Sequence, residues 1–176
     1  MAFEVEFSKR LDLFGAEIFA ALNDKKVALE AQGKKLYNLS VGTPDFEPMP
    51  HIKQALCDAA MVSENWKYSL RDLPELLDTV CAYYKRRRDA LCGGFRSIGW
   101  DVPDSHGSMF VWAPVPQGHG TSMEFCMEMI EKAGVICTPG SSFGPSGEGY
   151  VRFALTLPVE KITEAVQAVK NSGLVG

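Results

Sequence analysis

The stretch from Asp72 to Leu91 constrains the fold most, because it has the pattern of one uninterrupted helix. Asp72 can cap the first turn, Pro74 suits that turn, and Glu75 stands three residues after Asp72 as in a capping box. Apolar residues then recur at helical spacing and form one stripe: Leu73, Leu76, Leu77, Val80, Cys81 and Tyr84. Since no breaker precedes Gly93-Gly94, the pattern predicts a helix of about five turns over 73–91.

Helices and strands are mixed along the rest of the chain. Before this helix we predict helices over 13–32 and 49–62, a strand over 36–41 and a turn at 42–45. After it we predict strands over 97–102, 108–115, 135–138 and 150–155, with helices over 121–134 and 158–171. Thr121 and Glu124 form a second capping box. Short connections between these elements indicate an α+β domain with a small, largely antiparallel sheet.

Composition excludes several classes of function. The 176 residues fit one domain, and a formal net charge of -4 gives no reason to expect nucleic acid or an anionic membrane as a partner. The apolar runs are too short to span a bilayer, and the N-terminal residues do not resemble a signal peptide. Five cysteines without a Cys-x-x-Cys pair indicate a reduced, cytoplasmic protein. The scattered His51, His106 and His119 lack the spacing of metal ligands, so no metal site is expected.

Two stretches far apart in the sequence carry family-specific strings. VGTPDF occupies 41–46; PGSSFG occupies 139–144 and is followed by GYVRF at 149–153. Both resemble the substrate-facing parts of class I/II, fold-type I aminotransferases, which use pyridoxal phosphate, on the aspartate/alanine/LL-diaminopimelate branch. The resemblance covers nearly the whole chain but only about half of the family's architecture. It implies one small domain over 1–176, built from segments 1–87 and 88–176 joined where the large cofactor domain would be inserted.

The resemblance implies roles for three residues on the substrate side. Arg152 matches the arginine that holds the substrate α-carboxylate, and Gly42 matches a glycine in contact with the same carboxylate. Tyr68 matches a tyrosine that reaches across the dimer interface to the cofactor phosphate, although the family's following glycine-leucine pair is here Asp72-Leu73. Each residue also has an ordinary explanation: a surface arginine on a strand, a turn glycine, and a tyrosine partly buried against a helix.

Two further features have no clear place in that resemblance. The basic run of Lys85 to Arg88 is either a solvated helix face or a binding patch. The glycine-rich segment 140–149 lacks the Gly-Lys-Ser/Thr ending of a phosphate loop and leads into a strand, so it is not expected to bind phosphate in that way. By resemblance it lines the mouth of the family's active site.

The catalytic parts of the family are not found in the sequence. Transamination needs a lysine that bonds the cofactor, a carboxylate facing the pyridine nitrogen and a phosphate-binding helix N-terminus. The family's Ser-x-Ser-Lys and Asn-Pro-x-Asn-Pro strings are absent from the sequence. We therefore expect no catalytic residue and no cofactor in this chain, whereas the intact family uses pyridoxal phosphate with amino acid and 2-oxo acid substrates.

Three interpretations remain open. The chain is a non-catalytic small domain derived from an aminotransferase, a module that assembles with itself or with an intact relative, or a pyridoxal-phosphate enzyme that recruits its lysine from elsewhere. Apolar residues of the helices over 49–62 and 73–87 would face the cofactor domain in an intact relative: Ile52, Leu56, Leu76, Leu77 and Val80. We expect a homodimer or a helix-swapped dimer to cover them, unless these helices fold back onto the chain's own sheet.

Overall fold

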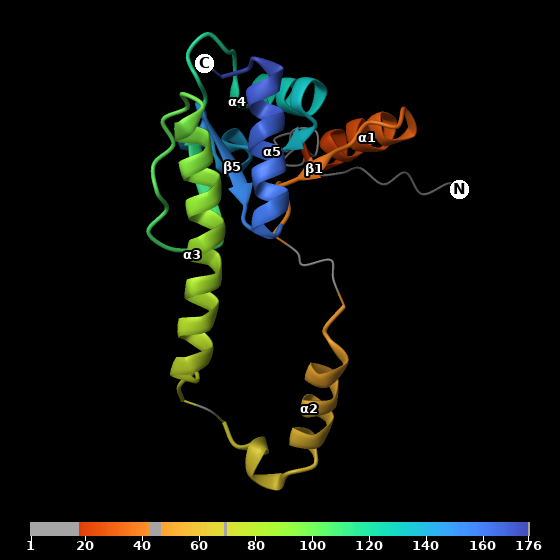
Figure 1. The fold of residues 1–176 in the computed structure, drawn as a ribbon, viewed down its shortest axis with the longest axis vertical. Coiled ribbons are helices and arrows are strands. Elements are labelled where there is room, and N and C mark those ends of the chain that lie inside the picture. The colour runs from red at the N-terminus through yellow and green to blue at the C-terminus, as the bar shows by residue number, and fades with distance from the viewer. Residues whose placement is uncertain (1–17, 43–46, 69, 176) are drawn as a thin grey trace, which may run out of the picture.

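The computed structural model describes residues 18–42, 47–68 and 70–175 (Figure 1). The helices of the main body are α1 (Ile18–Ala31), α4 (Ser122–Glu128) and α5 (Val159–Ser172), and α4 continues as the π-helical turn η3 (Met129–Ala133). The long helix α3 (Pro74–Ser97) joins this body to the outlying α2 (Pro50–Ala60) and η2 (Ser63–Trp66). The remaining elements are the strands β1 (Tyr37–Asn38), β2 (Phe110–Pro114), β3 (Val135–Ile136), β4 (Thr138–Pro139) and β5 (Tyr150–Ala154), and the 3-10 turns η4 (Gly140–Phe143) and η5 (Pro145–Gly147).

The strands form two small sheets. The larger sheet has the order β2-β5-β4, and both of its pairings are antiparallel. The smaller pairs β1 with β3 in parallel, with Tyr37 opposite Val135. The predicted α+β class with a small, largely antiparallel sheet is confirmed. The predicted strand over 135–138 is divided between the two sheets: Val135 and Ile136 form β3, Thr138 belongs to β4, and Cys137 between them belongs to neither strand.

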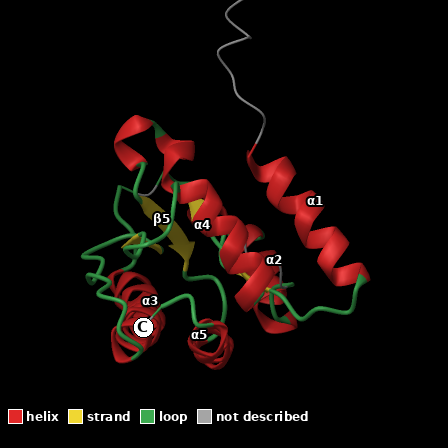
Figure 2. Cartoon of the chain, turned by 90° about the horizontal axis from the view of Figure 1, so that it is seen from above, coloured by secondary structure: helices red, strands yellow, loops and turns green. Residues whose placement is uncertain are grey.

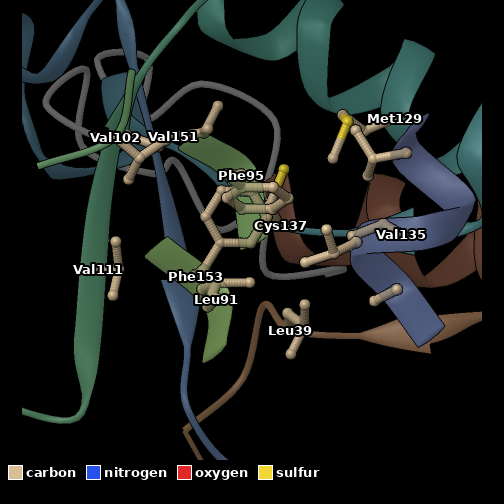
Figure 3. Packing of buried hydrophobic residues seen from close by; sticks show 14 of the residues in the cluster. Leu39, Leu91, Phe95, Val102, Val111, Met129, Val135, Cys137, Val151 and Phe153 are labelled. Carbon is tan, nitrogen blue, oxygen red and sulfur yellow. The ribbon is translucent and has the colours of Figure 1, made fainter. Parts of the chain in front are cut away.

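The core lies between the inner face of the larger sheet and the helices, as Figures 2 and 3 show. Val151 and Phe153 alternate along β5 with the more exposed Tyr150 and Arg152, so only one face of this strand is buried. The ring of Phe153 lies 5.3 Å from the ring of Phe95 on α3, and both belong to one cluster of buried side chains. This packing leaves the other face of the sheet available for polar and aromatic residues.

The predicted long helix is confirmed, and it continues beyond its predicted end. α3 runs without a break past Arg87 and through Gly93-Gly94 to Ser97. The predicted capping box at Asp72 is wrong: the N-cap is Leu73, which makes no side-chain capping hydrogen bond. The capping box at Thr121 is confirmed, since its hydroxyl accepts from the Glu124 N–H and the Glu124 carboxylate accepts from the Thr121 N–H.

The glycine pair belongs to the helix because α5 packs closely against it. A Cβ atom on Gly94 would lie 2.9 Å from a methyl carbon of Val166, whereas one on Gly93 would meet nothing within 4 Å. We therefore expect Gly94→Ala to destabilise the protein by about 1–3 kcal/mol through overpacking. Gly93→Ala is expected to leave stability unchanged or raise it by up to about 1 kcal/mol, because alanine is the better helix former. Urea unfolding measures both, and equal effects at the two sites would contradict the packing explanation.

Several other sequence predictions need correction. The predicted strand over 97–102 is wrong: α3 ends at Ser97 and an irregular segment follows, in which Val102 is buried without strand pairing. The strand over 36–41 is reduced to two residues, because only Tyr37 and Asn38 pair with β3. Residues 13–17 of the first predicted helix, and most of the turn at 42–45, lie outside the described residues.

α2 and the first half of α3 stand apart from the body of the molecule (Figure 1). α2 contains no buried residue, and the side chain of Leu56 is 71 % exposed. Leu76, Leu77 and Val80 on α3 are also exposed. In the single chain, therefore, these helices do not fold back onto the sheet, and the apolar faces predicted from the sequence have no partner within the described residues.

Candidate functional site

The candidate site lies on the outer face of the larger sheet, around Arg152. This residue is in the middle of β5, paired with Trp112 of β2 on one side and with Thr138 of β4 on the other. Directly opposed residues of neighbouring strands project to the same face of a sheet. Arg152 is therefore held on three short strands whose opposite face is anchored in the core.

Two phenylalanine rings enclose the guanidinium group of Arg152. Its central carbon lies 4.1 Å from the centroid of the Phe110 ring and 4.3 Å from that of Phe143. Nη2 donates a long hydrogen bond of 3.4 Å to the carbonyl oxygen of Ser40, and Nε is buried without a partner. Burial lowers the pKa of Arg152 from its usual value. No carboxylate of the described residues forms an ion pair with it, so the site holds a partly buried positive charge without a counter-ion.

The segment that contains Ser40 is held against the sheet by hydrogen bonds. The carbonyl oxygen of Leu39 accepts from the Ala154 N–H at 2.6 Å, and that of Ser40 accepts from the Thr138 hydroxyl at 3.0 Å. Gly42 follows this segment closely in the chain, and a Cβ atom on it would lie 2.8 Å from the Phe110 ring. Gly42 is thus required here for close packing. The structure brings Gly42 and Arg152 together at one phenyl ring, that of Phe110.

The loop that carries Phe143 is tied to the start of α4. The carboxylate of Glu148 accepts hydrogen bonds from the backbone N–H and the hydroxyl of Ser122, and from the Gly149 N–H. These bonds, the one from the Ser122 N–H above all, hold the pKa of Glu148 below its usual value. The ionised carboxylate therefore fixes the end of the loop at neutral pH.

Tyr68 is not part of this arrangement. It lies between η2 and α3, in the part of the chain that Figure 1 shows at the far end from the sheet. Its side chain is 88 % exposed, so the alternative of a tyrosine partly buried against a helix is wrong. The proposed contact of Tyr68 with a cofactor phosphate stays a prediction.

The basic run of Lys85 to Arg88 is neither a uniform solvated face nor a single patch. Arg87 is only 4 % exposed and donates hydrogen bonds to the carbonyl oxygen of Leu155 and the hydroxyl of Tyr83. Lys85 and Arg88 both form ion pairs with Asp89. Arg87, and Arg88 through a hydrogen bond to the carbonyl oxygen of Ser105, attach α3 to other segments, whereas Arg86 is exposed and Lys85 pairs within the helix.

Known proteins match this chain over part of its length. Residues 77–169 match the family described as aminotransferase class I and II. The chain belongs to this family. An LL-diaminopimelate aminotransferase of Dehalococcoides mccartyi is 34% identical over 164 residues, which cover 93% of this chain and 38% of that protein. One of Halothermothrix orenii is 43% identical over 98 residues, covering 56% of this chain and 25% of that protein. The chain thus spans well under half the length of these relatives.

Solved aminotransferase structures share the fold. The aromatic aminotransferase of Pyrococcus horikoshii matches with a TM-score of 0.53 and 26% identity, over 70% of this chain and 31% of that one. The substrate-bound BacF structure from Bacillus subtilis matches with a TM-score of 0.56 and 29% identity, over 58% and 26% of the two chains. These shares confirm that the chain corresponds to part of a fold-type I aminotransferase.

The residues around Arg152 do not fit the cofactor of the aminotransferase family. Pyridoxal phosphate is bonded through a lysine, and none of the described residues in contact with the Arg152 guanidinium group is a lysine. Two of the described lysines are engaged in ion pairs elsewhere: Lys25 with Glu131 and Lys35 with Glu164. No catalytic step through this cofactor can be built from the described residues.

A metal site and a membrane-spanning helix are both absent from the described residues. In the described part of the chain, no three His, Cys, Asp or Glu residues gather as a metal site would require. Over the same residues, none of the helices combines the length and apolar character needed to cross a membrane.

Sequence reasoning missed most of the residues that surround Arg152. Phe110, Ser40 and Thr138 lie on three different segments, and no local pattern links them to Arg152. The alternation of Phe110 and Trp112 along a predicted strand could have placed both rings on one face. Only the strand register shows that this is the face of Arg152.

Proposed function

We propose that this chain is a truncated aminotransferase that binds the carboxylate of an amino acid or 2-oxo acid at Arg152 and does not catalyse transamination alone. The observation that carries the proposal is the enclosed guanidinium group of Arg152, whose buried Nε lacks a partner. A planar guanidinium group binds a carboxylate with two parallel hydrogen bonds. The rings of Phe110 and Phe143 pack against this group, with their centroids 4.1 Å and 4.3 Å from its central carbon.

Electrostatics supports the same proposal. A charged group that is withdrawn from water without a counter-ion is destabilised. Among the described residues, Arg152 has only the Ser40 carbonyl oxygen as a hydrogen-bond acceptor, at 3.4 Å. A bound carboxylate would supply the missing charge and the missing acceptors. Gly42, which leaves room beside the Phe110 ring, is proposed to let the backbone approach the same carboxylate.

A binding experiment with pyruvate tests the role of Arg152. We expect saturable binding by the intact chain and at least about a tenfold loss in Arg152→Met, because hydrogen bonds between charged groups contribute about 1.5–3 kcal/mol. Arg86→Met is the matched control, since Arg86 is exposed on α3. Methyl pyruvate, which lacks the charge, should bind weakly to every variant. Equal pyruvate affinity in Arg152→Met and the unmodified protein would refute the proposal.

Turnover is a separate prediction. With pyridoxal phosphate added, the purified protein is expected to show no transaminase activity with alanine, aspartate or LL-diaminopimelate, and to be colourless after dialysis. The physical reason is the lack of a suitably placed lysine near Arg152. Activity that depends on the added cofactor would contradict this and would favour an enzyme that recruits its lysine from elsewhere. Neither result would bear on the use of pyridoxal phosphate by intact members of the family.

We further propose that the domain consists of two family segments joined without the large domain. The join is proposed between 87 and 88, so that segments 1–87 and 88–176 together form one small domain. The unbroken course of α3 through Arg87 and Arg88 is compatible with such a join. Mass mapping of peptides over 60–90, in protein purified from its source, tests this layout. Several hundred additional residues at that point would contradict it.

Assembly is the second candidate function, favoured by the exposure of α2. We propose that a second copy covers its apolar face, either as a homodimer or by exchange of helices between two chains.

A cytoplasmic location is also proposed, because all five cysteines are free thiols in the structure. Fractionation of the source cells tests the location, and recovery outside the cytoplasm would count against it.

A further inference from the structure

Three aromatic side chains border a hollow on the outer face of the sheet, next to Arg152. They are Trp112 of β2, Phe143 of η4 and Tyr150 of β5, and we call them the three-ring hollow. The ring of Trp112 meets that of Phe143 edge to face at 5.5 Å, and that of Tyr150 at 6.2 Å. The hollow has a volume of about 410 Å³ and is completed by Ser146 and Gly147. None of the described residues that line it is charged.

The residues that border the three-ring hollow stand on constrained backbone. Trp112 and Tyr150 stand on paired strands, and Phe143 is carried by a loop with little freedom to move. The backbones of Gly140 and Gly147 touch, because a Cβ atom on Gly140 would fall 2.0 Å from the carbonyl oxygen of Gly147. Binding there would need little ordering of the protein, which favours affinity.

The exposure of the rings indicates a function beyond packing. Trp112, Phe143 and Tyr150 are 38 %, 46 % and 45 % exposed, although they touch one another. Rings placed edge to face present both edges and faces to the space between them. A fourth aromatic ring can therefore meet them in the edge-to-face or offset-stacked geometry that aromatic pairs prefer.

The charges nearby discriminate between possible ligands. Aromatic hollows also bind organic cations through the ring faces. Here the guanidinium group of Arg152 lies 4.3 Å from the centre of the Phe143 ring. A cationic ligand would be repelled by this charge and would have to share the Phe143 ring with it. A saturated apolar ligand could fill the volume but would not gain the ring-to-ring geometry. The hydroxyl of Ser146 can bond one polar substituent.

We propose that the three-ring hollow binds a small, planar, uncharged aromatic compound that bears one hydrogen-bonding substituent. The hollow adjoins the carboxylate site proposed at Arg152, because Phe143 borders both, but its ligand needs no carboxylate. The ring of the ligand packs against the exposed parts of the Trp112, Phe143 and Tyr150 rings.

Nuclear magnetic resonance of the full chain tests this proposal with three probes: p-cresol, the saturated analogue 4-methylcyclohexanol and the cation benzyltrimethylammonium. The indole N–H of Trp112 reports binding, and Trp112→Phe assigns its signal. The other two indoles are engaged elsewhere, Trp66 with the carbonyl of Ala60 and Trp100 with that of Pro114. We expect p-cresol to shift the Trp112 signal saturably and to bind several-fold more tightly than either other probe.

Variants separate ring recognition from simple filling of an apolar hollow. Phe143→Leu and Tyr150→Leu each keep an apolar side chain and are expected to weaken p-cresol binding about 2- to 12-fold. Trp66→Leu, at an exposed ring on η2, is the control and should not change it. Equal binding of the saturated analogue, tighter binding of the cation, or the absence of a saturable shift in a folded protein would each overturn the proposal. Pyruvate binding tests the Arg152 site separately.

Discussion

In analytical ultracentrifugation at micromolar concentration, the protein is expected to sediment as a dimer rather than as a 19.3 kDa monomer. The reason is the apolar surface of α2, η2 and the first half of α3, which the described part of the chain leaves uncovered. Its large exposed apolar residues are Met49, Ile52, Leu56, Met61, Val62, Trp66, Tyr68, Leu70, Leu73, Leu76, Leu77, Val80 and Tyr83. Soluble monomers rarely expose a continuous apolar surface of this kind.

The free energy gained by burying this apolar surface favours a dimer, in which a second copy of the chain covers it. Burying apolar surface contributes about 25 cal/mol per Å², so a patch of several hundred Å² contributes several kcal/mol before the cost of association. A two-fold interface lets the same patch cover itself and is the commonest form of closed assembly. In an exchanged form, α2 of one chain would pack on α3 of the other.

Charge substitution within the patch provides the test. The double variant Leu56→Glu/Leu77→Glu is expected to be monomeric, because a dimer would bury two uncompensated carboxylates per chain. Val27→Glu is the control: Val27 is 56 % exposed on α1, outside the patch. A monomeric unmodified protein that binds no hydrophobic dye would show that the patch is covered within one chain. A dimer that persists in the double variant would show that the interface lies elsewhere.

The second large effect is expected at Arg87. Arg87→Met should lower the free energy of unfolding by about 2–4 kcal/mol, since it removes two hydrogen bonds from a charged donor and leaves the Leu155 carbonyl oxygen without one of its partners. The guanidinium group also lies 4.1 Å from the centre of the Tyr83 ring, a contact that would be lost as well. For a domain of this size, the loss corresponds to a drop of roughly 5–15 °C in the melting temperature.

The neighbouring arginine provides the control. Arg86 lies on the same helix and carries the same charge, but its side chain is exposed. Arg86→Met is expected to change stability by no more than about 0.5 kcal/mol. Calorimetry of both variants measures the difference. Equal melting temperatures would mean that Arg87 contributes no more than a surface residue and that α3 is attached chiefly by apolar packing.

The Arg87 site also illustrates the limit of reading a basic run from sequence. Four consecutive basic residues do not by themselves show which one faces inward. Arg87 lies four residues before the buried Leu91 and therefore shares its face of the helix. The carbonyl oxygen of Leu155 that selects Arg87 lies 68 positions away in the sequence. The same holds for Gly94, whose role depends on Val166 of another helix.

Local pattern determined the parts of the fold that depend on local interactions. Helical spacing predicted α2, α3 and α5, and the Thr121-to-Glu124 spacing predicted the start of α4, because hydrogen bonds and side-chain contacts within a helix join residues three or four apart. The resemblance to aminotransferases also rested on short local strings, those around Gly42 and Arg152. Asp72 had the right residue type for a cap, but the N-cap is Leu73 and the helix begins at Pro74.

Tertiary structure alone decided how these parts meet. The parallel pairing of Tyr37 with Val135, the division of 135–138 between two sheets and the enclosure of Arg152 all join residues that are far apart in the sequence. Strand pairing is set by burial and register across the whole domain, which a strand's own residues specify only weakly. The sequence by itself therefore determined which residue carries the charge at the candidate site. The packing of four separate segments decided that this charge lies between two phenyl rings, partly buried and without a counter-ion.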